Sequence, residues 1–113
     1  MKFMEERKKI IETISKMQAA GLIKNTSGNV SIKINKNILI TPSGKSYDEL
    51  QAKDLLLLDK DKNVIEGELI PSSETNLHYS LYENNDKIKS IVHTHSIYAT
   101  AVSTVIQELP PIH

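Results

Sequence analysis

The chain has 113 residues, of which 39% are hydrophobic, so it is long enough to bury one modest core. Its 14 Lys and Arg residues balance 14 Asp and Glu residues, so no net positive field favours nucleic acid or an anionic membrane. It has no cysteine, which excludes disulfides and thiolate chemistry. No stretch approaches the roughly 20 apolar residues of a membrane span, and the charged N-terminus is unlike a signal peptide. We therefore expect one cytoplasmic domain whose partner is a small molecule.

The first half of the chain predicts a helix and a β-hairpin. Apolar residues within 10–22 recur near a 3.6-residue period, with charged residues between them, and Gly21 is a stop signal. Residues 30–34 alternate apolar and polar side chains, which is typical of a half-buried strand. A polar turn at 35–37 leads into the apolar segment 38–40, which we expect to pair with the first strand.

The second half predicts three more strands and two helices. Residues 55–58 are consecutive leucines, and such a continuous apolar run predicts a strand buried on both faces. Residues 64–67 predict a return strand beside it, and 88–92 a later strand. Alanine and valine within 97–106 predict a short helix. Together these elements predict a three-layer α/β/α fold around a largely antiparallel or mixed central sheet.

The other helix of the second half precedes the strand at 88–92. Ser72 or Ser73 can cap its N-terminus, and it runs to about Tyr82. Its apolar spacing places Leu77 and Leu81 on the inner side.

Two histidines follow the strand that ends at 92. Side chains at i and i+2 of a strand point to one face, so His93 and His95 converge on one point. Glu74, at the start of the preceding helix, adds a carboxylate and completes a set of zinc-type ligands from two elements. Taken singly, the histidines fit two solvated imidazoles, and Glu74 fits an acid favoured by the helix macrodipole. Together they favour a metal site.

His78 lies four residues after Glu74, on the same helical face. The favoured interpretation is a residue that orients Glu74. A metal ligand and a structural histidine remain alternatives.

Three turns of the chain are rich in backbone N–H and hydroxyl donors: 28–29, 43–44 and 72–73. Such donors at the starts of helices suit a phosphate group. Taken singly, each turn is more typical of an ordinary turn or cap than of a phosphate site.

Four blocks of the sequence occur in the order found in one known family: TSGNVS at 26–31, ITPSG at 40–44, PSSETNLH at 71–78 and HTHS at 93–96. On these blocks the chain resembles the class II aldolase/adducin family, from about residue 10 to residue 113. Within that family it is most similar to the zinc-dependent L-fuculose-phosphate aldolases. The resemblance implies the same three-layer fold, a lyase of carbohydrate metabolism, and a homotetramer.

The resemblance also implies roles for particular residues. Zn²⁺, or another divalent metal, would be held by His93, His95 and Glu74, and Glu74 would also be the catalytic base. The substrate phosphate would be bound by the turn residues Gly28, Asn29, Ser43, Gly44, Ser72 and Ser73. The implied reaction cleaves a fuculose 1-phosphate-like sugar to dihydroxyacetone phosphate and an aldehyde through a metal-stabilised enediolate.

Other functions within the superfamily stay open. Sugar-phosphate 4-epimerases tend to have Asp where this chain has Glu74, which favours an aldolase over an epimerase. A methylthioribulose-phosphate dehydratase is a further alternative. So is a non-catalytic interaction module like the adducin head, against which the intact His93, His95 and Glu74 argue.

Family members continue beyond the segment that corresponds to residue 113, and their third zinc histidine lies there. We therefore expect residues 1–113 to be the N-terminal domain of such an enzyme, truncated at its C-terminus. Alone, it is expected to bind zinc weakly and to show no aldolase turnover.

Overall fold

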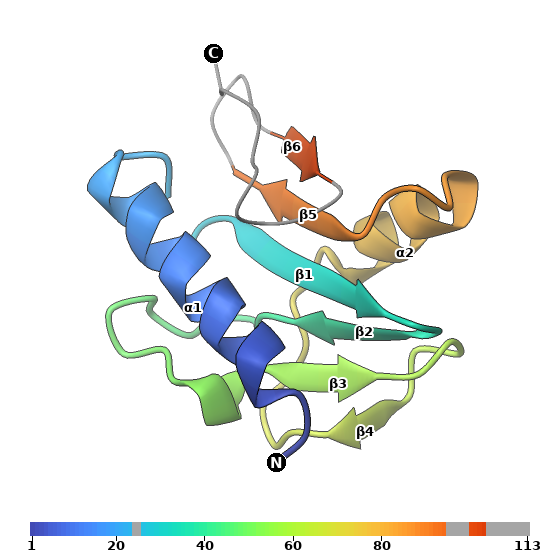
Figure 1. Cartoon of the computed structure of the whole chain (residues 1–113). Coiled ribbons are helices and arrows are strands. Elements are labelled where there is room, and N and C mark those ends of the chain that lie inside the picture. The colour runs from blue at the N-terminus through green and yellow to red at the C-terminus, as the bar shows by residue number, and fades with distance from the viewer. Residues whose placement is uncertain (24–25, 95–99, 104–113) are drawn as a thin grey trace.

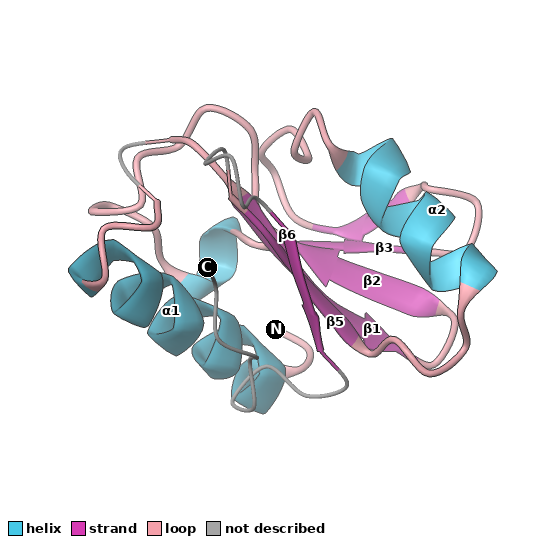
Figure 2. Cartoon of the chain, turned by 90° about the horizontal axis from the view of Figure 1, so that it is seen from above, coloured by secondary structure: helices cyan, strands magenta, loops and turns pink. Residues whose placement is uncertain are grey.

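The described part of the chain folds into a six-stranded sheet with one long helix on each face (Figures 1 and 2). The computed structural model describes residues 1–23, 26–94 and 100–103. In chain order the elements are α1 (Met4–Ala19), β1 (Asn29–Ile34), β2 (Asn37–Ile40), the 3₁₀ helix η1 (Ala52–Asp54), β3 (Leu56–Leu58), β4 (Val64–Glu66), α2 (Thr75–Asn84), β5 (Ser90–His93) and β6 (Thr100–Ser103). The predicted three-layer α/β/α fold is confirmed.

The strands lie in the order β4-β3-β2-β1-β5-β6, and all neighbouring strands are antiparallel. The predicted hairpin is β1 with β2, in which Ile34 pairs with Asn37 across a tight turn. On the other side of β1 lies β5, with Asn29 directly opposite His93. This register brings the first residue of β1 beside the last residue of β5.

Each face of the sheet has its own apolar core. The α1 side includes Val30, Leu39 and Val92, and the α2 side includes Ile38, Ile40 and Ile91. The leucine run divides between them: Leu55 and Leu57 contact the α1 core, and Leu56 and Leu58 the α2 core. The prediction that this strand is buried on both faces is confirmed, because helices cover both faces of the sheet.

The prediction of a half-buried strand at 30–34 holds for 32–34, which are partly buried, but not for Val30 and Ser31. Val30 lies in the α1 core, whereas Ser31 is fully buried on the opposite face beneath α2. Alternation of apolar and polar residues usually marks one solvated face. At Ser31 the polar face is covered by α2, and hydrogen bonds satisfy the hydroxyl.

The predicted helix at 97–106 is wrong for Thr100–Ser103, which form strand β6 paired with β5. Pairing supplies hydrogen-bond partners for the backbone groups along the outer edge of β5. A short run of small and β-branched residues fits either state locally, so this pairing decides between them. The remainder of 97–106 lies outside the described residues.

Helix α2 also differs in detail. Its first residue is Thr75, and the preceding Glu74 makes no side-chain capping bond, so neither serine occupies the cap position. The inner face is formed by His78, Tyr79 and Tyr82, while Leu77 is 36% exposed and Leu81 only partly buried. Neither long helix of the described residues combines the length and apolarity needed to cross a membrane.

Candidate functional site

The turns that follow β2 and precede α2 are joined at the end of the sheet where β1 begins. Thr41 lies just after β2, and its hydroxyl accepts a hydrogen bond from the Val30 amide at 3.2 Å. The backbone carbonyl of Thr41 accepts a second bond, from the Ser72 amide at 3.1 Å. The amide of Ser43 donates to the Ile70 carbonyl at 2.7 Å. Antiparallel pairing puts the start of β1, the end of β2 and the end of β5 at one edge. The three predicted donor turns therefore meet there, beside His93.

Gly28 is required where the first turn enters β1. Its φ of +86° lies in the left-handed region, and a Cβ atom built there would lie 2.8 Å from the carbonyl oxygen of His93. The buried hydroxyl of Tyr47 donates to the Gly28 carbonyl. Burial raises the pKa of Tyr47 to about 12, so this hydroxyl keeps its proton. Glycine thus lets the turn pack directly against the strand that carries His93.

Ser72 organises the turn before α2. Its side-chain oxygen accepts a hydrogen bond from the Glu74 amide at 3.1 Å, and its carbonyl accepts one from the Thr75 hydroxyl at 2.6 Å. A serine hydroxyl that accepts one bond still has its proton to donate. Ser72 is buried, whereas Ser73 is exposed and Glu74 half-buried. The turn can therefore offer hydroxyl donors and a carboxylate side by side.

The second donor turn is more open. Ser43 and Gly44 are both exposed, and a Cβ atom at Gly44 would meet nothing within 4 Å. A ligand can reach the hydroxyl and backbone amides of this turn from solvent.

The predicted metal ligands are placed only in part. His93 ends β5 and is half-buried, with its Nδ1 atom buried. Glu74 immediately precedes α2. His95 lies outside the described residues. Within residues 1–23, 26–94 and 100–103, no three His, Asp or Glu side chains are grouped so that they could hold a metal ion.

His78 contacts different residues from the one expected. Its side chain hydrogen-bonds to the side chains of Asn29 and Ser31, and with Glu74 it shares only a backbone hydrogen bond at 3.2 Å. The ring is fully buried. Burial, together with the nearby charge of His93, lowers the pKa of His78 to about 3, so the imidazole is neutral at physiological pH. The structure therefore links His78 to a predicted phosphate-binding residue instead of to Glu74.

Sequence reasoning missed this network, which also includes the Tyr82 hydroxyl 2.7 Å from Ser31 Oγ. Two periodicities contained the signal. Asn29 and Ser31 are two residues apart and share one face of β1, and His78 and Tyr82 are four apart and share one face of α2. The signal was incomplete, because neither pattern says that these two faces pack together.

Comparison with known proteins assigns the family. The model of the class II aldolase and adducin N-terminal domain matches residues 8–113. The chain belongs to the class II aldolase and adducin family. Its relatives include 5-deoxy-D-ribulose 1-phosphate aldolase of Bacillus thuringiensis serovar kurstaki, 40% identical over 99% of this chain and 54% of the relative. L-fuculose phosphate aldolase of Escherichia coli K12 is 36% identical over 94% of this chain and 49% of the relative.

A solved structure gives the same result for this class II aldolase family member. The structure of an L-fuculose 1-phosphate aldolase superposes with a TM-score of 0.81 and 34% sequence identity, covering 87% of this chain and 47% of that one. The chain thus spans about half the length of the relatives that it matches.

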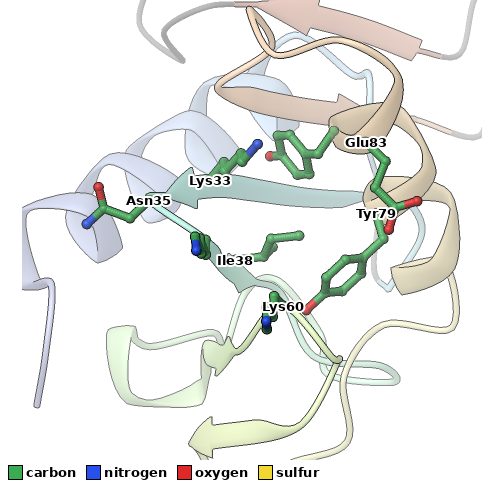
Figure 3. A pocket seen from close by; sticks show the side chains of 8 residues that line it. Lys33, Asn35, Ile38, Lys60, Tyr79 and Glu83 are labelled. Atoms are coloured by element: carbon green, nitrogen blue, oxygen red, sulfur yellow. The ribbon is translucent and has the colours of Figure 1, made fainter.

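A separate pocket of this family member lies at the other end of β1, beside the β1–β2 turn (Figure 3). Lys33 from β1 and Tyr79 and Glu83 from α2 contribute to its walls, and Lys33 Nζ lies 5.9 Å from the ring centre of Tyr82. The other lining residues are Asn35, Lys36, Ile38, Lys60 and Tyr82. None of the predicted site residues lines this pocket, so it is distinct from the site at the start of β1.

Proposed function

We propose that the protein is a metal-dependent aldolase that cleaves a ketose 1-phosphate to dihydroxyacetone phosphate and an aldehyde. The observation that carries the proposal is the meeting of three donor turns beside a histidine and a carboxylate. The turns contribute Asn29, Ser43 and Ser72, and His93 and Glu74 lie at the same end of the sheet. In this proposal residues 1–113 are the N-terminal domain of a homo-oligomeric enzyme, a homotetramer by family resemblance.

The phosphate group of the substrate binds at the three turns. Gly28, Asn29, Ser43, Gly44, Ser72 and Ser73 supply the donors. Neutral amides and hydroxyls can hold a phosphate through charge-assisted hydrogen bonds without a lysine or arginine in the first contact layer. Binding there fixes the position of the three-carbon fragment relative to Glu74.

The donor types also fit a metal ion. His93 and His95 offer imidazole nitrogens and Glu74 a carboxylate, the ligands that zinc takes in catalytic sites. When bound, zinc or another divalent ion supplies a Lewis acid for the carbonyl and hydroxyl oxygens of the substrate.

Glu74 moves the proton at the carbon that becomes the nucleophile. Half-burial removes part of its hydration, and the turn formed with Ser72 holds its backbone in place. A positioned and partly desolvated carboxylate exchanges a proton with carbon better than a solvated one does. In a reversible aldol reaction the same carboxylate accepts this proton in one direction and returns it in the other.

The substrate proposed first is L-fuculose 1-phosphate. A second candidate is 5-deoxy-D-ribulose 1-phosphate, because a relative named for it is 40% identical over nearly the whole of this chain. Both are ketose 1-phosphates that would give the same three-carbon phosphate product.

The test is an assay of the enzyme that contains this chain. Release of dihydroxyacetone phosphate is measured from both sugars, with zinc and after removal of metal by a chelator. We expect release that depends on metal, and we expect His93→Ala to lower both the bound zinc and the rate. Zinc content unchanged by His93→Ala, or no release from either sugar, would contradict the proposal.

A further inference from the structure

We infer that His78 is a positioning residue that fixes the side-chain amide of Asn29 with its NH₂ group, and not its carbonyl oxygen, facing the candidate site. The inference rests on the proposed function for the ligand, since a phosphate needs donors at that position. The buried face of α2 would then contribute to anion recognition, a role that neither the family match nor the names of the relatives state.

The network lies between α2 and β1 and is almost entirely buried. His78 and Ser31 are fully buried, and Asn29 and Tyr82 are each 3% exposed. Nδ1 of His78 lies 2.6 Å from Ser31 Oγ, which lies 2.7 Å from the Tyr82 hydroxyl. On the other side of the ring, Nε2 of His78 is hydrogen-bonded to Oδ1 of Asn29.

Each proton of this chain of bonds can be assigned. Oδ1 of Asn29 only accepts, so Nε2 of His78 must be the nitrogen that carries the proton. A neutral imidazole then accepts at Nδ1, and the single proton of Ser31 goes to it. The Tyr82 hydroxyl therefore donates to Ser31. The bonds run in one direction, from the phenol to the amide.

The reverse direction would turn the amide around. Nδ2 of Asn29 would donate to His78, and the ring would donate to Ser31. Only one of the two hydroxyl protons, of Ser31 or of Tyr82, could then be used in the bond between these residues. In the part of the chain that the structure describes, Ser31 is the one hydrogen-bond partner of the Tyr82 hydroxyl. The reverse arrangement would thus leave one buried hydroxyl proton, that of Ser31 or that of Tyr82, without an acceptor there, which is unfavourable. The hydroxyl groups at one end of this series of hydrogen bonds therefore select the orientation of the Asn29 amide at the other end.

The selected orientation matters for chemistry because Asn29 lies opposite His93 in the sheet. With Oδ1 turned toward His78, the planar amide directs Nδ2 and its two protons to the opposite side. Two N–H donors suit a phosphate, whereas a carbonyl oxygen in that place would repel it and suit a cation. His78 thereby selects for an anion without contacting it.

The direct test is the tautomer of His78 in the ¹⁵N-labelled 113-residue protein, read from the chemical shifts of the two ring nitrogens without any ligand. We expect the Nε2–H tautomer. The Nδ1–H tautomer would overturn the inference, whatever the fate of the proposed aldolase function.

The second measurement is a titration with inorganic phosphate. In the wild type we expect the Asn29 NH₂ signals to shift, and in His78→Phe about a tenfold weaker phosphate affinity. His78→Gln, whose amide can donate to Asn29, should recover most of the loss. Tyr79→Phe is the matched control, because its hydroxyl bonds to Asp59 outside the network.

The outcomes separate the two ideas. Phosphate binding that His78→Phe leaves unchanged would overturn the positioning role while leaving the phosphate site intact. No phosphate binding by the wild type, with the Nε2–H tautomer present, would overturn the anion ligand and the phosphate site of the proposed function together. If His78→Phe does not fold, the comparison of His78→Gln with the wild type and the tautomer still decide.

Discussion

Gly28 and Glu74 act at the scale of one residue. Gly28 has no side chain, so the backbone of its turn can approach the carbonyl of His93. Glu74 has its amide bonded to Ser72 Oγ, which leaves the carboxylate to project from the start of α2. At Gly28 the local backbone geometry decides which residue type the position accepts.

We predict that Gly28→Ala destabilises the protein by about 2–3 kcal/mol, combining left-handed backbone strain with a steric clash. The new Cβ would lie 2.8 Å from a backbone oxygen of His93 and 2.8 Å from Ile23 Cγ2. Gly44→Ala is the matched control: φ is also positive, at +72°, but nothing lies within 4 Å of the Cβ. Denaturant unfolding of both variants measures the difference. If both variants lose the same free energy of unfolding, the clash at position 28 does not contribute.

We predict that Glu74→Gln retains metal but slows proton exchange at the reactive carbon of dihydroxyacetone phosphate by roughly 10²–10⁴-fold. The amide keeps the size of the side chain and cannot accept the proton. Exchange into deuterated water, followed by NMR with the enzyme that contains this chain, gives the rate. Glu83→Gln, an exposed glutamate of α2, serves as the control. Wild-type exchange in Glu74→Gln would exclude Glu74 as the base.

At the scale of elements, α2 packs on β1 through polar side chains, whereas the residues of β3 on the same face are apolar. Ser31 on β1 meets His78 and Tyr82, while Leu56 and Leu58 on β3 belong to the apolar core of the same face. Buried polar groups cost free energy unless they are paired, so this interface specifies one arrangement of helix and strand. It is also an interface that is sensitive to protonation.

We predict that stability falls as the pH is lowered below about 6.5. The pKa of His78 is about 3 in the folded protein, because of burial first and the charge of His93 second, against about 6.5 in the unfolded chain. Between these values the unfolded chain binds one more proton, so the free energy of unfolding decreases with falling pH by up to about 1.4 kcal/mol per pH unit.

Urea unfolding at about pH 7, 6 and 5, with a chelator present, measures this dependence. His78→Gln has no titrating ring and should show a flatter pH dependence. The same slope in both proteins would show that His78 does not remain neutral in the folded state.

At the scale of the whole molecule, the edge strand β4 presents apolar side chains on its outer surface. Val64 and Ile65 of β4 are 46% and 48% exposed, and Leu69 and Ile70 after it are 38% and 75% exposed. An apolar group at the edge of a sheet is a surface that other chains cover.

We predict that the 113-residue protein associates through β4 and the segment after it as its concentration rises. Sedimentation velocity over a range of concentrations measures the association. The double variant Ile65→Lys with Ile70→Ser should shift the protein toward the monomer, because it adds charge to the edge and removes exposed apolar area. Leu77→Ser, at an exposed leucine of α2, should leave the association unchanged. Association of the double variant at wild-type concentrations would refute the assignment of this surface.

The sequence by itself determined the elements whose signals are local. The periodicity before Gly21 predicted α1, the alternation and turn around 35–37 predicted the hairpin, and the leucine run predicted a strand buried on both faces. These patterns need only a few neighbouring residues to be read, because they follow from the geometry of helix and strand. The order of four motif blocks likewise led to the family, which the match over residues 8–113 confirms. The roles of His93, His95 and Glu74 remain predictions.

Only the tertiary structure decided which faces meet. The state of Thr100–Ser103 depended on pairing with β5, and the partner of His78 was Asn29, 49 residues away in sequence, instead of Glu74 on the same helix. A buried polar side chain takes the hydrogen-bond partner that the packed neighbouring element presents, because leaving it unpaired in the interior costs more than any local preference provides. That choice is made between elements, and no periodicity within a single element contains it.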